Sequence, residues 1–171
     1  MDPNAGKKKL RNRLGRDAAI AALDAEDFER KTTSFYRYVK ISDPKAMRHL
    51  LYSEWSNMGV FGRVYLAEEG INAQISVPEP QWSNFIETLH LHNEFDLMHQ
   101  KIAVEDDGKS FFKLTIKIKK QIVADGLDFG EYDITNVGNH LNAEQWNQAM
   151  EKGATVVDMR NHYESEIGHF K

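Results

Sequence analysis

Along residues 33–120, segments with the period of a strand alternate with segments with the period of a helix. The order of these segments constrains the fold more than any other feature of the sequence. Residues 34–41 alternate with period two, which is typical of a strand with two unlike faces. A helical period follows, beginning with Pro44 in its first turn and ending at Gly59. Further patterns predict strands at 63–67 and 71–77, a helix over 80–91, and strands at 101–105 and 111–118.

The order strand, helix, strand, strand, helix, strand, with one further strand, limits the architecture to few possibilities. It predicts an α+β sandwich of the ferredoxin-like or acylphosphatase-like kind. In that fold one antiparallel sheet carries two helices on one face. The other face of the sheet stays polar, because nothing in the pattern supplies a second apolar layer to cover it.

Charge is distributed unevenly along the chain, whose net charge is −4. Residues 1–30 are expected to form a basic tail with a lead-in helix over 17–30, and residues 31–122 a nearly neutral domain. The tail is either a solvated arm or an arm that seeks phosphates, since its cations would release counterions from nucleic acid. The cations of the tail are Lys7, Lys8, Lys9, Arg11, Arg13 and Arg16.

An acidic region follows, in which residues 123–140 are expected to form a linker and residues 141–171 the start of a second domain. Asn142 is a capping residue for a helix that ends before Gly153. Residues 154–159 are apolar and β-branched, which is typical of a strand buried in a parallel sheet. One helix and one strand cannot form a core alone. We therefore expect this second domain to be cut short, and its exposed strand to self-associate or to pack back onto the first domain.

The outward-facing side chains of the predicted sheet combine aromatic rings, amides and cations. Rings can stack on bases, amides can read base edges and cations can bind phosphates, so the face is a candidate RNA platform. Two other interpretations remain: open sheet faces are ordinarily polar, and the second domain could cover this one. The candidate RNA-binding residues are Tyr36, Tyr38, Lys40, Arg63, Tyr65, Asn72, Gln74, Lys113, Lys117 and Lys119.

Several classes of function have no sequence support. Without cysteine, these residues contain no disulfide, thiol nucleophile or cysteine metal site. Glycine-rich phosphate loops and nucleophile elbows are also absent from the sequence. His90, His92 and His99 lack further ligands at a suitable spacing, so no metal site is expected. With no membrane-length apolar run and no secretory signal pattern, a cytoplasmic protein is the expectation.

Residues 156–170 resemble the opening motif of rhodanese domains, in which a buried strand ends in Asp-x-Arg and a Gly-His pair follows. The matching residues are Asp158, Arg160, Glu164 and His169. The resemblance implies that they order a loop and act as scaffold. It also implies that the sulfur-carrying cysteine of such domains would lie beyond Lys171. No catalytic residue can therefore be assigned here, and sulfur transfer by that mechanism is excluded for these residues.

Longer blocks resemble the bacterial tRNA uridine hydroxylase family, including TTSFYRYVKISDPKA, VFGRVYLAEEGINAQISVP and DDGKSFFKL. That family joins an acylphosphatase-like domain, a rhodanese domain and a cysteine-rich region. The resemblance implies oxygen-dependent formation of 5-hydroxyuridine at the wobble position of tRNA, with molecular oxygen as co-substrate and no cofactor held by these residues. It further implies that this chain is the N-terminal part of a longer enzyme, inactive alone and contributing tRNA binding. Its partners would be tRNA and the enzyme's own rhodanese and C-terminal regions.

The alternative is a non-catalytic packing or dimerisation module of a rhodanese-type sulfurtransferase or regulatory protein. Such a module would touch no RNA. Salt dependence separates the two hypotheses, because phosphate contacts weaken steeply with ionic strength and packed apolar interfaces do not.

Overall fold

The computed structural model describes residues 14–104, 106–123, 133, 138–158 and 166–168. The chain divides into two compact units, residues 1–135 and residues 136–171, and each is described by itself. No helix in the described ranges is long and apolar enough to cross a membrane.

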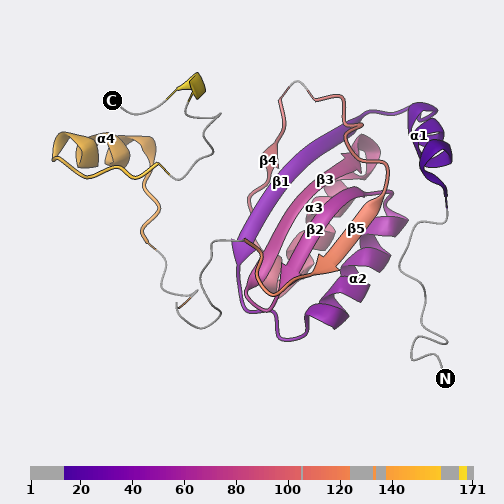
Figure 1. Ribbon diagram of the computed structural model, residues 1–171, viewed down its shortest axis with the longest axis horizontal. Coiled ribbons are helices and arrows are strands. Elements are labelled where there is room, and N and C mark those ends of the chain that lie inside the picture. Colours follow the sequence, from indigo (N-terminus) through magenta and orange to yellow (C-terminus); the bar gives the residue numbers. More distant parts are fainter. Residues whose placement is uncertain (1–13, 105, 124–132, 134–137, 159–165, 169–171) are drawn as a thin grey trace. The chain divides into compact units, whose positions relative to one another are not determined.

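The first unit is built on a five-stranded sheet in the order β4-β1-β3-β2-β5 (Figure 1). Its strands are β1 (Arg30–Tyr38), β2 (Phe61–Ala67), β3 (Gly70–Pro78), β4 (Lys101–Ile102) and β5 (Leu114–Ile118). β1 pairs antiparallel with β3 and β4, and β2 pairs antiparallel with β3. β5 pairs parallel with β2, so the sheet is mixed rather than wholly antiparallel as expected. The reason is that the chain crosses from β4 to the far edge and enters β5 beside the start of β2.

Two helices, α2 (Pro44–Asn57) and α3 (Trp82–Leu91), cover one face of this sheet (Figure 1). Short 3-10 turns, η1 (Glu79–Gln81) and η2 (Asn93–Phe95), flank α3. This arrangement confirms the predicted α+β sandwich. The lead-in helix is shorter than expected: α1 (Arg16–Asp24) ends well before residue 30, and Arg30 already belongs to β1.

The core lies between the two helices and the sheet. Trp55 of α2 is fully buried and meets Phe35 of β1 and Phe85 of α3 edge to face, with ring centroids 6.3 and 5.5 Å away. Edge-to-face rings contribute about 0.5–1.5 kcal/mol beyond their buried area. In β2 and β3 every second residue is buried in this core, as Val64 and Ala73 are. The intervening residues therefore project from the opposite face of the sheet.

Several strand boundaries differ from the periodicity. The strand expected over 34–41 is β1, shifted toward the N-terminus; residues 39 and 41 bond instead to the turn after β2, through Val39 N to Glu69 O and Ile41 N to Glu68 O. The strand expected over 111–118 begins only at Leu114. Alternation in sequence marks side-chain direction, whereas a strand also needs a bonded neighbour along its length.

The second unit contains α4 (Ala143–Glu151), which confirms the predicted helix. Asn142 and Gln145 form a reciprocal capping box at its start. The buried strand expected over 154–159 is wrong for residues 154–158, which form no strand, and Val157 is 73% exposed. Backbone groups of a strand need a partner strand, and the described part of this unit contains none. Met159 lies outside the described residues.

Candidate nucleic-acid interface

The sheet face opposite α2 and α3 carries a row of unlike polar side chains across four strands. Tyr36 of β1 is paired with Asn72 of β3, Asn72 with Tyr65 of β2, and Tyr65 with Lys117 of β5. A neighbouring row continues this arrangement through Ser34, Gln74, Arg63 and Thr115. We call the two rows, with Tyr38 and Lys119, the open face. Alternation within each strand puts these side chains on one side of the sheet.

Exposure varies within the open face. Tyr36 is 61% exposed, and Arg63, Gln74 and Lys117 are also exposed. Tyr38, Tyr65 and Asn72 are half-buried. Tyrosine and arginine side chains presented on a sheet can stack on unpaired bases, and the cations can contact phosphates.

Three predicted residues lie outside the strands. Lys119 follows β5 and stays aligned with the sheet, because its backbone N–H donates to Leu66 O at 2.7 Å. Its Nζ lies 5.3 Å from the centroid of the Tyr65 ring. Lys113 precedes β5, with Nζ 5.7 Å from the Phe112 ring, and Lys40 lies exposed beyond the end of β1. Of the three, Lys119 is the one that the structure joins to the open face, through Tyr65.

Asn72 is already engaged by the chain. Its Nδ2 donates to Ile122 O at 3.4 Å, and Ile122 N donates to the buried Glu69 Oε1 at 2.7 Å. Ile122 itself is buried. The segment that leaves β5 is therefore fixed against the sheet at residue 122, and Asn72 serves that anchor. The sequence interpretation of Asn72 as a base-reading amide missed this contact.

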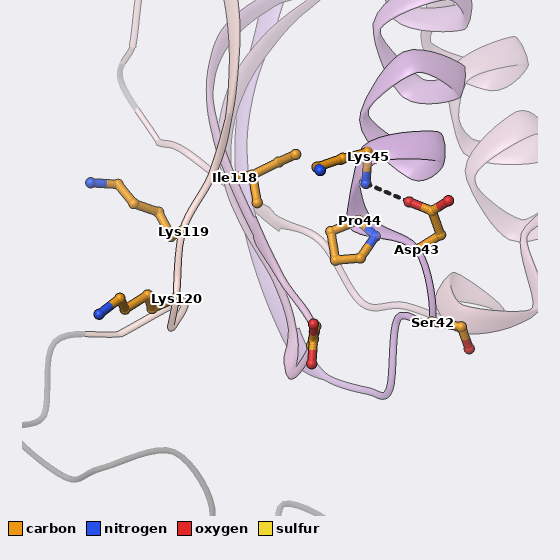
Figure 2. A pocket seen from close by; sticks show the side chains of 8 residues that line it. Ser42, Asp43, Pro44, Lys45, Ile118, Lys119 and Lys120 are labelled. Atoms are coloured by element: carbon orange, nitrogen blue, oxygen red, sulfur yellow. Dashed lines mark hydrogen bonds between the residues drawn. The ribbon is translucent and has the colours of Figure 1, made fainter.

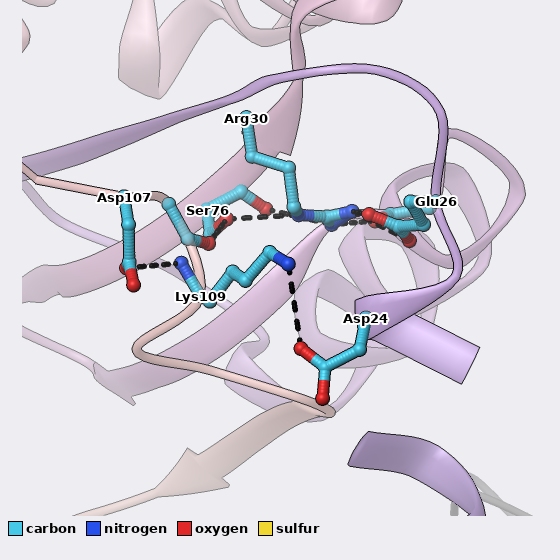
Figure 3. Close-up of polar contacts among 8 residues, drawn as sticks. Asp24, Glu26, Arg30, Ser76, Asp107 and Lys109 are labelled. Atoms are coloured by element: carbon cyan, nitrogen blue, oxygen red, sulfur yellow. Dashed lines mark hydrogen bonds and ion pairs between the residues drawn. The ribbon is translucent and has the colours of Figure 1, made fainter. Parts of the chain in front are cut away.

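The other end of the same face is covered, which the sequence interpretation missed. Arg30 has the same strand side as Tyr36, yet it is buried. Its Nε donates to Ser76 Oγ at 2.9 Å, and its Nη1 donates to both carboxylate oxygens of Glu26 at 3.2 Å (Figure 3). The guanidinium carbon lies 4.2 Å from the centroid of the Phe61 ring. We call this cluster the covered end.

The turn at Asp106-Asp107-Gly108 closes the covered end. Ser76 Oγ donates to Gly108 O, and Thr32 Oγ1 donates to Asp106 Oδ1. Gly108 has φ +72°, and a Cβ there would stand 2.6 Å from Arg30 Cβ. This turn, which lies between β4 and β5 in the chain, therefore packs on the sheet. In the sequence, the one signal for the burial of Arg30 was Glu26, four residues before it. These opposite charges are close enough along the chain to form an ion pair.

The protonation equilibrium of Arg30 is affected by its burial at the covered end. Removal from water lowers the pKa of the Arg30 guanidinium, whereas the charge and hydrogen bond of Glu26 raise it. Because arginine stays protonated, the cation is held inside the structure by its partners. The role of this cluster is consequently structural: it holds the start of β1, β3 and the turn at Gly108 together, and we call it a lock in that sense. It is unsuited to binding an external phosphate.

A hollow of about 520 Å³ opens at the opposite end, between the start of α2 and the end of β5 (Figure 2). It adjoins the open face through Lys119, which borders both. No sequence pattern pointed to it, because its walls come from three separate segments. The lining residues are Ser42, Asp43, Pro44, Lys45, Glu68, Ile118, Lys119 and Lys120.

The residues expected to order a rhodanese loop fall largely beyond the described ranges. Asp158 is described and exposed, whereas Arg160, Glu164 and His169 lie outside the described residues. Lys171, beyond which the resemblance puts the family's cysteine, also lies outside the described residues. The scaffold role of these residues, and the expectation that the chemistry belongs to a cysteine beyond Lys171, therefore stay predictions.

The histidines near α3 contact protein groups. His92 pairs with Glu54 at 2.8 Å, and His90 Nε2 lies 3.3 Å from Met98 O. Within the described residues, no group of three or more histidines and acids could hold a metal ion.

Comparisons with known proteins point to one family. A family model described as the UPF0176 acylphosphatase like domain matches residues 30–122. The chain is 52% identical to a tRNA uridine(34) hydroxylase of Leptospira interrogans over 96% of its own length and 45% of the relative's. It is 48% identical to the enzyme of that name from Yersinia enterocolitica, over 95% of this chain and 47% of the relative. The chain thus spans about half the length of the curated relatives it matches.

Proposed function

Because the chain belongs to the UPF0176 acylphosphatase-like domain family, we propose that it is the N-terminal part of a tRNA hydroxylase. The reaction would form 5-hydroxyuridine at the wobble position, which the names of the similar proteins support. Molecular oxygen would be the co-substrate, and no residue of this chain is assigned to it. The proposed tRNA substrate makes the cytoplasm the site of action.

Within that enzyme, the open face would bind tRNA. The observation that carries this role is the row from Tyr36 through Asn72 and Tyr65 to Lys117, which spans four strands. The anticodon loop is single-stranded, and single-stranded RNA is bound by aromatic platforms flanked by cations. Tyr36 and Tyr65 would stack on bases, while Arg63, Lys117 and Lys119 would contact phosphates.

The remaining segments would connect this domain to the chemistry. We propose that residues 123–140 link it to a rhodanese domain that begins at residue 141. Asp158, with Arg160, Glu164 and His169, would order the first loop of that domain. This chain would be catalytically inactive alone, since the family's cysteine does not occur among its residues.

Binding to bulk bacterial tRNA at two salt concentrations tests the role of the open face. In the triple variant Arg63→Ala, Lys117→Ala, Lys119→Ala we expect weaker binding and a salt slope smaller by about 2, at roughly 0.7 per single-strand phosphate contact. The matched control is Lys31→Ala, Lys109→Ala, Lys152→Ala, which removes the same charge from residues outside the two rows of the open face. The control should bind as the wild type does.

The opposite result would favour the packing or dimerisation module. In that case the wild-type chain would bind no tRNA at low salt. The domain would then act as a partner for other parts of a rhodanese-type sulfurtransferase or regulatory protein, through contacts that salt does not weaken. Equal loss of binding in both triple variants would instead mean that the open face is not the surface that binds tRNA.

A further inference from the structure

The hollow at the end of β5 has a cationic rim that the sequence did not reveal. Lys119 and Lys120 lie next to each other on one side, where their side chains extend outward, and Lys45 lies on the other side at the start of α2 (Figure 2). Pro44 and Ile118 supply apolar wall between them. The volume of about 520 Å³ falls within the range of about 300–1,000 Å³ typical of ligand pockets.

These lysines keep their charges available. Neither Lys45, Lys119 nor Lys120 forms an ion pair with another residue in the described part of the chain. Lys31 and Lys109, elsewhere in the domain, pair with Glu79 and Asp24. A lysine without an internal ion pair can bind a phosphate of a polyanion, and so release its counterions, without first breaking a contact within the protein.

The lysine side chains, and not the helix end, supply the positive charge of this rim. Asp43 Oδ1 accepts hydrogen bonds from Lys45 N at 2.9 Å and Ala46 N at 3.0 Å. The first amides of α2 are therefore occupied by the chain's own carboxylate. Glu68 is the second acid of the lining, so the lining contains three lysines and two carboxylates.

Lys119 connects the hollow to the open face. It lines the hollow, and its Nζ lies 5.3 Å from the Tyr65 ring centroid in the central row of the open face. Lys117 precedes it along β5 and is paired with Tyr65. A strand of RNA stacked on Tyr65 would have these cations beside it, and its next phosphates would reach the rim.

We propose that the hollow is a phosphodiester subsite, which receives the backbone of an RNA strand as it leaves the open face over the end of β5. Lys45 and Lys120 contact its phosphates, and Lys119 is shared with the stacked nucleotide. This assignment rests on the proposed tRNA-binding role. The subsite would strengthen binding and fix the position of the RNA strand. It would not distinguish one base from another, because only the backbone is contacted.

The test is the salt dependence of tRNA binding by the double variant Lys45→Ala, Lys120→Ala. We expect the slope to fall by about 1.4, at roughly 0.7 for each phosphate contact. The loss should be the same for oligonucleotides of different base sequence, because only phosphates are contacted. Lys31→Ala, Lys109→Ala is the matched control for charge, since both residues lie outside the open face and the hollow, and it should leave the slope unchanged.

Each outcome decides the assignment. If the double variant matches its control while Lys117→Ala weakens binding, the subsite is wrong and the tRNA-binding role stands. If the wild-type chain binds no tRNA, both fail. Thermal unfolding verifies that the double variant is folded. Should it be destabilised, Lys120→Ala alone, located beyond the end of β5, must lower the slope by about 0.7 or the subsite is wrong.

Discussion

The covered end and the open face belong to the same side of one sheet, yet their cations have opposite environments. Arg30 and Tyr36 lie on the same side of β1, because an even number of positions separates them along the strand. Arg30 is buried and fully engaged by Glu26, Ser76 and the Gly59 carbonyl. Arg63 and Lys117 are exposed, and no other described residue forms an ion pair with them.

The difference teaches that residue type does not define a binding surface. An arginine on a polar sheet face is a ligand contact in one place and a lock in another. What distinguishes them is whether a loop lies on top: the turn at Gly108 packs onto Arg30, whereas Tyr36 remains 61% exposed. Replacing residues on the two regions should therefore affect different measurements, stability at one and RNA binding at the other.

The largest effect is expected for Arg30→Ala. It removes one partner of a buried ion pair and leaves Ser76 and Glu26 without their donor, so we expect a loss of about 3–5 kcal/mol in the free energy of unfolding. Urea denaturation of the chain measures it. Arg63→Ala, an exposed arginine on the same side of the sheet, should change stability by about 0.5 kcal/mol or less. Equal losses of stability for the two variants would contradict the distinction between the covered end and the open face.

Gly108→Ala should come next, because it acts on the turn that covers Arg30. The left-handed backbone, φ +72°, costs about 1–2 kcal/mol for a non-glycine residue, and the new Cβ would also collide with Arg30 Cβ at 2.6 Å. Gly59→Ala in the same unit is the matched control, since it has φ +69° and its new Cβ would meet Pro78 Cγ only at 3.4 Å, an ordinary contact. Thermal unfolding should show a clearly larger loss at Gly108; identical losses would mean that the collision contributes nothing.

Tyr36→Ala should weaken RNA binding and leave stability nearly unchanged. Because Tyr36 is exposed, stability should change by about 0.5 kcal/mol or less. Loss of one stacking contact should weaken tRNA binding by about 1–3 kcal/mol, roughly 5- to 150-fold. Fluorescence anisotropy with a labelled anticodon stem-loop measures this loss. Tyr36→Phe keeps the ring and should bind nearly as wild type, whereas a loss in Tyr36→Phe equal to that in Tyr36→Ala would argue against stacking.

The smallest effect is expected for Lys109→Ala, within the covered end itself. Lys109 Nζ pairs with Asp24 at 3.3 Å, but the two side chains are 43% and 61% exposed (Figure 3). Exposed pairs contribute about 0–1 kcal/mol. Urea denaturation at low and high salt should barely distinguish this variant from the wild type. A loss of stability as large as that of Arg30→Ala would mean that the exposed pair of Lys109 and Asp24, and not Arg30, stabilises the covered end.

The sequence by itself determined the local features of this protein. Period-two and helical patterns predicted which segments of the first unit are strands and helices, and Pro44 and Asn142 correctly marked the starts of α2 and α4. Alternation also predicted the side of the sheet to which Tyr36 and Lys117 belong. These features depend on a residue and its near neighbours in the chain, so the order of side chains is sufficient to reveal them.

Only the tertiary structure decided which part of the polar face stays open. The contact of Thr32 with Asp106 joins residues 74 positions apart, and the anchor between Glu69 and Ile122 joins residues 53 apart. The hollow beside Lys119 likewise draws its walls from three segments. Such contacts form because backbone and polar groups that are brought together must find partners when they are buried. No local pattern encodes which distant segment will provide them, and so the same alternating strand contains both a lock and a candidate RNA contact.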